Sequence, residues 1–223
     1  MPVRASNGMK KSILIWVGVF AGTFLALFLL IKYQGGTVAD SGKVYPEVSI
    51  ISSTDQTKGK VDSKVVLVEY GDFQCPACAA FQPLVDEIMK TYGDRIQLVF
   101  RDFPLPQHQF AVPAARYAEA AGKQGKYWEM YDKIYAGQTK WASLKDADPI
   151  FQSYAQDLKL DMVMLKKDMD SDSIKTGIED DRLSGVKFYV NSTPTFFLNG
   201  KKLVFKSLNY EEFKSYIDTA LGG

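Results

Sequence analysis

The residues of this sequence best suited to chemistry are two cysteines separated by two residues, Cys75-Pro76-Ala77-Cys78. They are the protein's only cysteines, and they could form a redox dithiol, half of a zinc site, or a buried pair without chemistry. A zinc site requires about three or four protein ligands, and His108 is the only histidine. Haem attachment requires a histidine directly after the second cysteine, where Ala79 stands. The shortage of further ligands favours the redox dithiol, with two inert buried cysteines as the alternative.

The dithiol lies between a predicted strand and a predicted helix. Lys64 to Tyr70 is a nearly continuous apolar and β-branched run, typical of a strand covered on both faces. From the dithiol to Tyr92, apolar residues recur at three- and four-residue spacing, which predicts an amphipathic helix with Pro76 in its first turn and a kink at Pro83. A second strand is predicted over Arg95 to Arg101. Such strand–helix–strand units are nearly always parallel and right-handed, which places the dithiol at the carboxyl end of the first strand, where open α/β sheets bind their ligands.

The block from 107 to 184 is predicted to be helical throughout, as a subdomain inserted between strands. Its predicted helices are Val112 to Gly122, Gly125 to Ala136, Asp148 to Lys159, Asp161 to Asp170 and Ser171 to Leu183. The second of these contains four aromatic residues at helical spacing, Tyr127, Trp128, Tyr131 and Tyr135. That spacing predicts core packing rather than a cradle for a cofactor.

Turn signals organise the remaining segments. Asn199-Gly200 lies between the apolar runs Thr195 to Leu198 and Lys202 to Phe205, which predicts a β-hairpin. Tyr210 to Leu221 has apolar residues at helical spacing and is predicted to be the last helix. Earlier in the chain, Val44 to Ile51 is predicted to be a short edge strand, and a polar, turn-rich stretch follows it.

Near the N-terminus, the sequence contains an uncharged, largely apolar run from Ile13 to Ile31. At about 1.5 Å per residue it can cross a bilayer core, and it is longer than the roughly 7–15 apolar residues of a cleaved signal peptide. Three basic residues precede the run and only Lys32 lies close behind it, so the positive-inside rule predicts a cytoplasmic N-terminus and an exported remainder. We therefore predict a retained signal anchor, with cleavage near Thr37-Val38-Ala39 as the alternative.

Export changes what the two cysteines imply. Exported proteins commonly use disulfides as staples spread along the chain. A bridge between Cys75 and Cys78 closes almost no loop and therefore adds little stability. Chemistry explains such a bridge better than stabilisation does.

Three motifs together resemble the DsbA-like thiol:disulfide oxidoreductases of the thioredoxin superfamily. They are Val68-Glu69-Tyr70-Gly71-Asp72-Phe73-Gln74-Cys75-Pro76-Ala77-Cys78, the turn Phe103-Pro104-Leu105-Pro106-Gln107-His108, and Ser192-Thr193-Pro194-Thr195-Phe196-Phe197. The resemblance covers about Val61 to Leu221. It implies an α/β thioredoxin fold with an inserted helical subdomain, preceded here by one N-terminal transmembrane helix. We expect a cytoplasmic N-terminus (1–12), a transmembrane signal anchor (13–31), a tether (32–60), a thioredoxin-like domain (61–106 and 185–223) and the inserted subdomain (107–184).

The two cysteines are expected to have different roles. Cys75 would be the attacking thiolate, because the start of a helix favours negative charge. Cys78 would be the resolving thiol that closes the disulfide after a mixed-disulfide intermediate. The resemblance also implies that Glu69 is a buried acid that relays a proton to Cys78, while an exposed position at the strand end is the alternative. His108 is predicted to be structural rather than a catalytic base.

The resemblance further implies where a client chain would bind. It places a cis peptide bond at Pro194 against the dithiol, whereas sequence alone would favour an ordinary trans turn proline. The backbone of Thr193 would then offer strand-like hydrogen bonds to the client. Pro76 and Ala77, between the cysteines, complete the expected substrate-binding residues.

By this resemblance the protein is an extracytoplasmic thiol:disulfide oxidoreductase whose only redox group is its own disulfide, with no metal. A disulfide-permissive compartment favours an oxidase that acts on reduced exported proteins. We expect a monomer in the cell membrane with a single span, which a quinone-linked membrane oxidase reoxidises. The formal net charge of +1, with both signs mixed, gives no basic surface for nucleic acid. A reductase or isomerase, a non-catalytic peptide-binding module and an electron carrier to one membrane partner are the alternatives.

Overall fold

The computed structural model describes residues 42–222 and, before them, Trp16, Phe20 and residues 22–27. The chain divides into two units, Met1–Asp40 and Ser41–Gly223. In the first unit the described residues are helical. Among all the described residues, no helix is both long enough and apolar enough to cross a membrane. The predicted cytoplasmic N-terminus (1–12) and most of the predicted anchor (13–31) lie outside the described residues.

A mixed five-stranded sheet forms the centre of the second unit, with the strand order β1-β3-β2-β4-β5. The strands are β1 (Gln56–Gly59), β2 (Val66–Gly71), β3 (Gln97–Asp102), β4 (Thr195–Leu198) and β5 (Lys201–Lys202). β2 and β3 are parallel, and the other neighbouring strands are antiparallel. Helix α2 (Pro76–Tyr92) joins β2 to β3 and continues through Pro83. The predicted strand–helix–strand unit is therefore confirmed.

The two central strands, β2 and β3, are buried along their whole length, and apolar side chains on both of their faces pack against other elements. On one face, Leu67 and Leu98 pack with α2 and with the last helix, α9 (Tyr210–Leu221). On the other face, Val68 and Val99 pack with residues of η1 (Pro46–Ser49) and of the segment before β4. The dithiol follows directly from the buried end of β2.

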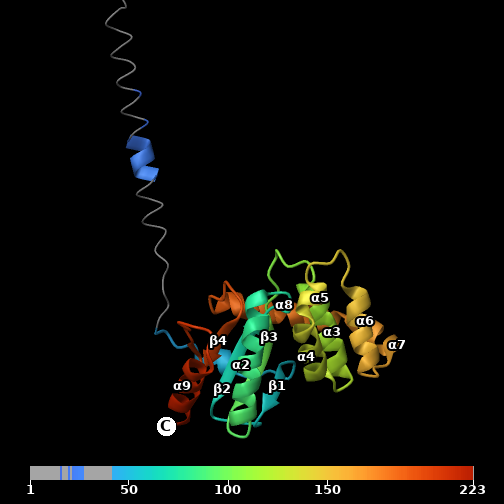
Figure 1. Ribbon diagram of the computed structural model, residues 1–223. Helices are drawn as coiled ribbons and strands as arrows, with labels where there is room; N and C mark the ends of the chain where they lie inside the picture. The colour runs from blue at the N-terminus through green and yellow to red at the C-terminus, as the bar shows by residue number, and fades with distance from the viewer. Residues whose placement is uncertain (1–15, 17–19, 21, 28–41, 223) are drawn as a thin grey trace, which may run out of the picture. The chain divides into compact units, whose positions relative to one another are not determined.

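The helical insertion lies between β3 and β4, and Figure 1 shows α3 to α7 gathered on one side of the sheet. Its helices are α3 (Ala111–Lys123), α4 (Tyr127–Ala136), α5 (Gln138–Trp141), α6 (Asp148–Asp157), α7 (Met162–Met169) and α8 (Asp172–Lys187). The predicted helices are confirmed with small shifts at their ends, and only the short α5 was not predicted. Both cysteines belong to the same apolar core as these helices. The insertion thus forms one wall around the dithiol.

The segment before β2 differs from its prediction. Val44 to Ile51 is not an edge strand, because Pro46–Ser49 forms the 3-10 helix η1 and Val44 makes only an isolated bridge with Lys201. Proline at the first position suits a helix start, where its missing N–H costs nothing. Strand β1 lies within the range 32–60 that was expected to be a tether, and it pairs with β3. The sheet therefore includes a strand further towards the N-terminus than predicted. The sequence of β1, Gln-Thr-Lys-Gly, has no alternation of apolar and polar residues that could have predicted it.

The C-terminal hairpin follows its turn signal. Asn199 and Gly200 both have positive φ angles, 49° and 79°, as a tight two-residue turn requires. The second strand is Lys201–Lys202 and not Lys202 to Phe205, so the hairpin is shorter than predicted. Helix α9 has the predicted bounds, with the side chain of Asn209 accepting a hydrogen bond from Glu212 N at its start.

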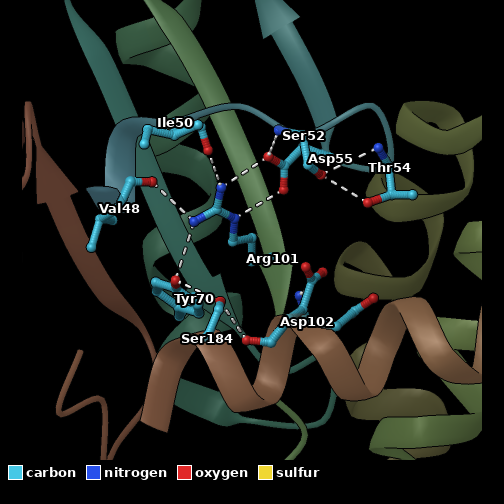
Figure 2. A network of polar contacts seen from close by, with 10 residues as sticks. Val48, Ile50, Ser52, Thr54, Asp55, Tyr70, Arg101, Asp102 and Ser184 are labelled. Atoms are coloured by element: carbon cyan, nitrogen blue, oxygen red, sulfur yellow. Dashed lines mark hydrogen bonds and ion pairs between the residues drawn. The ribbon is translucent and has the colours of Figure 1, made fainter. Parts of the chain in front are cut away.

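A buried ion pair ties the segment before β1 to the sheet, as Figure 2 shows. The guanidinium of Arg101 on β3 donates to the carbonyl oxygens of Val48 and Ile50 at 2.9 and 2.8 Å. It also binds both carboxylate oxygens of Asp55 at 2.9 Å and lies 3.2 Å from the hydroxyl of Tyr70. The side chains of Arg101 and Asp55 are 7% and 1% exposed, so each charge is neutralised within the protein. This network holds η1 against the sheet.

Candidate active site

The dithiol begins helix α2 directly after a turn at the end of β2. Cys75 is the N-cap residue of α2 and Pro76 the first helical residue. Cys75 N donates to the carbonyl oxygen of Asp72 at 3.0 Å, which closes the turn. The first turn of a helix has unpaired backbone N–H groups and the positive end of the helix dipole. The sequence therefore places the sulfur of Cys75 where a negative charge is stabilised.

The two thiols are free in this structure and buried, with Cys75 7% and Cys78 1% exposed. Cys75 Sγ lies 3.3 Å from the carbonyl oxygen of Thr193, to which it donates a hydrogen bond when it is protonated. The peptide bond between Thr193 and Pro194 is cis, as predicted. The fold thus brings the dithiol and the Thr-Pro motif together. Pro76 and Ala77 are exposed beside Cys75.

The two thiols have opposite acid–base properties. The pKa of Cys75 is lowered to about 5, first by the hydrogen bond that it receives from the Cys78 thiol and further by the backbone N–H groups of Ala77 and Cys78, against the effect of burial. The pKa of Cys78 is raised well above its ordinary value by burial, by donating to Cys75, and by the negative charge of Glu69. At neutral pH, Cys75 is therefore a thiolate and Cys78 a thiol.

Glu69 is buried in the middle of the sheet, 1% exposed, between Phe100 on β3 and Phe196 on β4. Burial raises its pKa to about 8, and the negative charge of Asp86 adds to the increase. Its Oε2 atom has no hydrogen-bond partner among the described residues. Glu69 is therefore buried, as the resemblance implied, and the alternative of an exposed position at the strand end is wrong. Its negative charge is close enough to Cys78 to raise the pKa of that thiol.

Asp72 connects the dithiol turn to the turn after β3, and its role was not predicted. Its Oδ1 accepts a hydrogen bond from Gln74 N at 2.7 Å. Its Oδ2 accepts from Leu105 N at 2.8 Å and lies 2.7 Å from Nδ1 of His108. Asp72 N also lies 3.5 Å from Cys78 Sγ. His108 is thus a structural partner of Asp72, and an aspartate between strand and helix is a turn signal that could have indicated this role.

Gln138 in α5 holds the backbone on both sides of the dithiol turn, and nothing in the sequence indicated this role. Its Nε2 donates to the carbonyl oxygens of Phe73 and Cys75 at 2.8 and 3.0 Å, and the side chain is buried. Gln74 reinforces the contact by donating to the carbonyl oxygen of Ala142 at 2.9 Å. The insertion therefore fixes the backbone that carries Cys75.

Metal ligands are scarce around this site. Within the part of the chain that the structure describes, no three His, Cys, Asp or Glu side chains are grouped so that they could hold a metal ion. The groups that the fold assembles are two sulfurs, a buried acid and a backbone carbonyl. Together they can exchange protons and electron pairs with an incoming thiol or disulfide.

Residues 52–219 match the family model described as Thioredoxin. The chain belongs to the thioredoxin family. Two solved structures of the same fold are BdbD from Bacillus subtilis in its oxidised form and alpha-DsbA1 from Wolbachia pipientis. BdbD is 24% identical with a TM-score of 0.66, covering 82% of this chain and 98% of that chain. Alpha-DsbA1 is 22% identical with a TM-score of 0.69, covering 79% and 96%.

Sequence relatives of this thioredoxin-family chain include much longer proteins. The Na(+)/H(+) antiporter NhaA 1 of Salinispora arenicola is 34% identical over 177 residues, which are 79% of this chain and 26% of the antiporter. The chain thus spans about a quarter of the length of the curated relatives that it matches. The thioredoxin fold with an inserted helical subdomain agrees with the fold expected from the sequence.

Proposed function

We propose that this thioredoxin-family protein is a thiol:disulfide oxidoreductase and that Cys75 and Cys78 are its redox couple. The observation that carries the proposal is the pairing of a thiolate with a thiol: the pKa of Cys75 is lowered to about 5, while that of Cys78 is raised. Geometry supports the same assignment, because Cys75 caps the start of α2 between the exposed Pro76 and the Thr193 carbonyl, while Cys78 lies deeper in the core. Solved structures of the same fold include a thiol-disulfide exchange protein of Wolbachia pipientis, alpha-DsbA2, which supports the same chemistry.

In the oxidising direction the reaction has two displacements. A thiolate of the client attacks Cys75 Sγ of the oxidised protein, the bond between the two cysteines breaks, and its electron pair goes to Cys78 Sγ, which takes a proton from Glu69. A second client thiolate then attacks the client sulfur of the mixed disulfide, and Cys75 leaves as a thiolate. The client gains a disulfide and the protein becomes a dithiol. A membrane oxidase linked to quinones would take up the electron pair and restore the disulfide.

The charge on Cys75 supports the oxidising direction. A thiolate stabilised in the reduced protein makes reduction of the disulfide more favourable, which makes the disulfide a better oxidant. We propose more specifically that the protein is an oxidase for reduced exported proteins, because of this charge and the predicted anchor at 13–31. A reductase or isomerase is the alternative, and we propose a monomer attached to the cell membrane in either case.

A client chain would bind beside the exposed Pro76 and Ala77 and along the backbone at Thr193 and Pro194. Support for this comes from the carbonyl oxygen of Thr193, which lies 3.3 Å from Cys75 Sγ. An extended client lying along this segment would place its own sulfur next to Cys75.

The test uses the purified protein and a reduced, unfolded client with two cysteines. The wild-type protein, oxidised beforehand, should form client disulfides. Cys78→Ala receives the same client with its disulfide already formed: the Cys75 thiolate should attack that disulfide and stay joined to the client as a mixed disulfide, because the resolving thiol is missing. Cys75→Ala should do neither. Absence of any mixed disulfide with Cys78→Ala would overturn the proposal, and binding of the client by Cys75→Ala without catalysis would point to a peptide-binding module. Equilibration with glutathione then gives the direction, since a strongly reducing potential would favour the reductase.

A further inference from the structure

Helix α4 carries three tyrosines whose hydroxyl groups lie in the protein interior. Tyr127, Tyr131 and Tyr135 follow each other at four-residue spacing and lie on one face of the helix. All three hydroxyl oxygens are buried, and none has a hydrogen-bond partner among the described residues. Phenylalanine would fill the same space without burying a polar group, which is unfavourable when the group is unpaired. Packing alone therefore does not explain three hydroxyls in this row.

Two of these tyrosines, Tyr131 and Tyr135, lie over the part of the sheet that contains Glu69. The Tyr135 hydroxyl oxygen is 3.3 Å from the position that a Cβ atom would occupy on Gly71. Side chains alternate along a strand, so Gly71 and Glu69 face the same side of β2. The Tyr131 ring lies 4.8 Å from that of Tyr135 and 5.1 Å from that of Phe100, measured between centroids. Phe100 is the register partner of Glu69 on β3, so both tyrosines cover this part of the sheet.

The same place contains the buried sulfur. Cys78 belongs to the apolar core that includes Tyr131 and Tyr135. The pKa values of both tyrosines are raised by burial and then by the negative charges of Glu69 and Cys78. Glu69 Oε2 is itself without a partner among the described residues. Two donors without acceptors thus lie near an acceptor without donors.

Few other charged groups act on this cluster. Asp86 on α2 and Asp132 on α4 both carry negative charge towards it, and Asp72 acts on Tyr135 from the dithiol turn. The neighbouring strands contribute the apolar rings of Phe100 and Phe196. Since every charged group named here is an acid, an ionised Glu69 has no positive partner among them. Neutral donors are the groups available to stabilise its charge.

We propose that Tyr131 and Tyr135 are positioning residues for the proton that passes between Glu69 and Cys78. Their hydroxyls donate hydrogen bonds to the Glu69 carboxylate, directly or through one buried water, whenever Glu69 is ionised. The inference rests on the proposed function, in which the electron pair of the broken disulfide goes to Cys78 Sγ. The proton then moves from the Glu69 carboxylic acid to that sulfur. This leaves a carboxylate in an apolar core, and the two hydroxyls stabilise it. Attack by Cys78 in the reverse reaction returns the proton to Glu69.

The experiment compares Tyr131→Phe, Tyr135→Phe and the double variant with Tyr127→Phe in the full chain. Tyr127 is the matched control, because its hydroxyl is equally buried and unpaired on the same helix, while the charges that act on it are those of Asp102, Glu119 and Asp181 together with Tyr131. Carbon-13 NMR of glutamate-labelled protein follows the Glu69 carboxyl through a pH titration, and Glu69→Gln assigns its signal. Loss of hydrogen bonds to a carboxylate should move its titration upward by about one pH unit in the double variant. Tyr127→Phe should leave it in place.

The second readout is the pH dependence of mixed-disulfide formation by the oxidised protein. Its midpoint should rise together with the Glu69 titration in the double variant, and the tyrosine substitutions should have no such effect in a Glu69→Gln background. An unchanged Glu69 titration in the double variant, or an equal shift with Tyr127→Phe, would overturn the inference. The NMR titration needs no client, so it remains decisive even if the wild-type protein forms no mixed disulfide and the proposed function fails.

Discussion

Cys75 Sγ and the carbonyl oxygen of Thr193 are 3.3 Å apart, although the two residues are separated by 118 positions in the sequence. This contact joins the start of α2 to the segment that precedes β4. It places the sulfur beside the backbone of that segment. This arrangement supports the proposed binding of an extended client chain along that segment.

The low pKa of Cys75 should depend on the proton that Cys78 donates. Thiolate absorbance of the reduced protein should show a transition near pH 5. In Cys78→Ala the largest stabilising contact is lost, and the transition should rise by about one to two pH units. Cys78→Ser keeps a hydroxyl donor at the same position and should show a smaller rise. A transition that stays near pH 5 in Cys78→Ala would mean that the helix start alone lowers the pKa.

Glu69 should make the protein's stability depend on pH. Because burial raises its folded-state pKa from 4.5 to about 8, the folded protein holds a proton that the unfolded chain has lost between these values. Its contribution is therefore complete below about pH 4.5 and declines as the pH rises towards 8, by about 1.4 kcal/mol per pH unit. Glu69→Gln, which stays neutral, should unfold at increasingly higher urea concentration than wild type between these pH values. Glu87→Gln, at an exposed position of α2, serves as the control and should follow the wild type.

Gln138 should matter for both stability and reactivity of the dithiol. Gln138→Leu leaves the carbonyl oxygens of Phe73 and Cys75 without their donor, which should cost about 1–3 kcal/mol of unfolding free energy. The rate of alkylation of Cys75 should also change, since its backbone is no longer fixed. Gln109 donates to the carbonyl oxygen of Leu144 at an exposed position. Gln109→Leu should therefore change the free energy of unfolding by less than about 0.5 kcal/mol.

The Arg101–Asp55 pair should stabilise the fold without affecting the chemistry. Asp55→Asn leaves the buried guanidinium without its counter-charge, and urea unfolding should show a loss of about 3–5 kcal/mol. The thiolate transition of Cys75 should stay unchanged in the folded protein. Glu129→Gln breaks the exposed pair with Lys126, whose side chains are 46% and 44% exposed, and should cost less than about 1 kcal/mol. Equal losses in the two variants would show that burial does not strengthen the first pair.

Those features of the fold that depend on neighbouring residues could be predicted from the sequence. The apolar run before Cys75 and the helical spacing after it predicted β2 and α2, and Pro76 indicated the first turn of the helix. Asn199-Gly200 predicted the hairpin, because few other residues adopt positive φ angles in succession. Each of these signals is local, since backbone preferences and side-chain periodicity are set within one element.

Which polar groups come into contact depends on the packing of elements that are far apart in the chain. A glutamate in a strand has the same local pattern whether it is buried or exposed, so the raised pKa of Glu69 required the packing of β3, β4 and the helices around it. Likewise, neither the carbonyl oxygen of Thr193 nor the amide of Gln138 carries a sequence signal for its partner, because any residue has a carbonyl and most amides face water. The polar strand β1 was missed for the same reason: its place in the sheet comes from pairing with β3 and not from its own sequence.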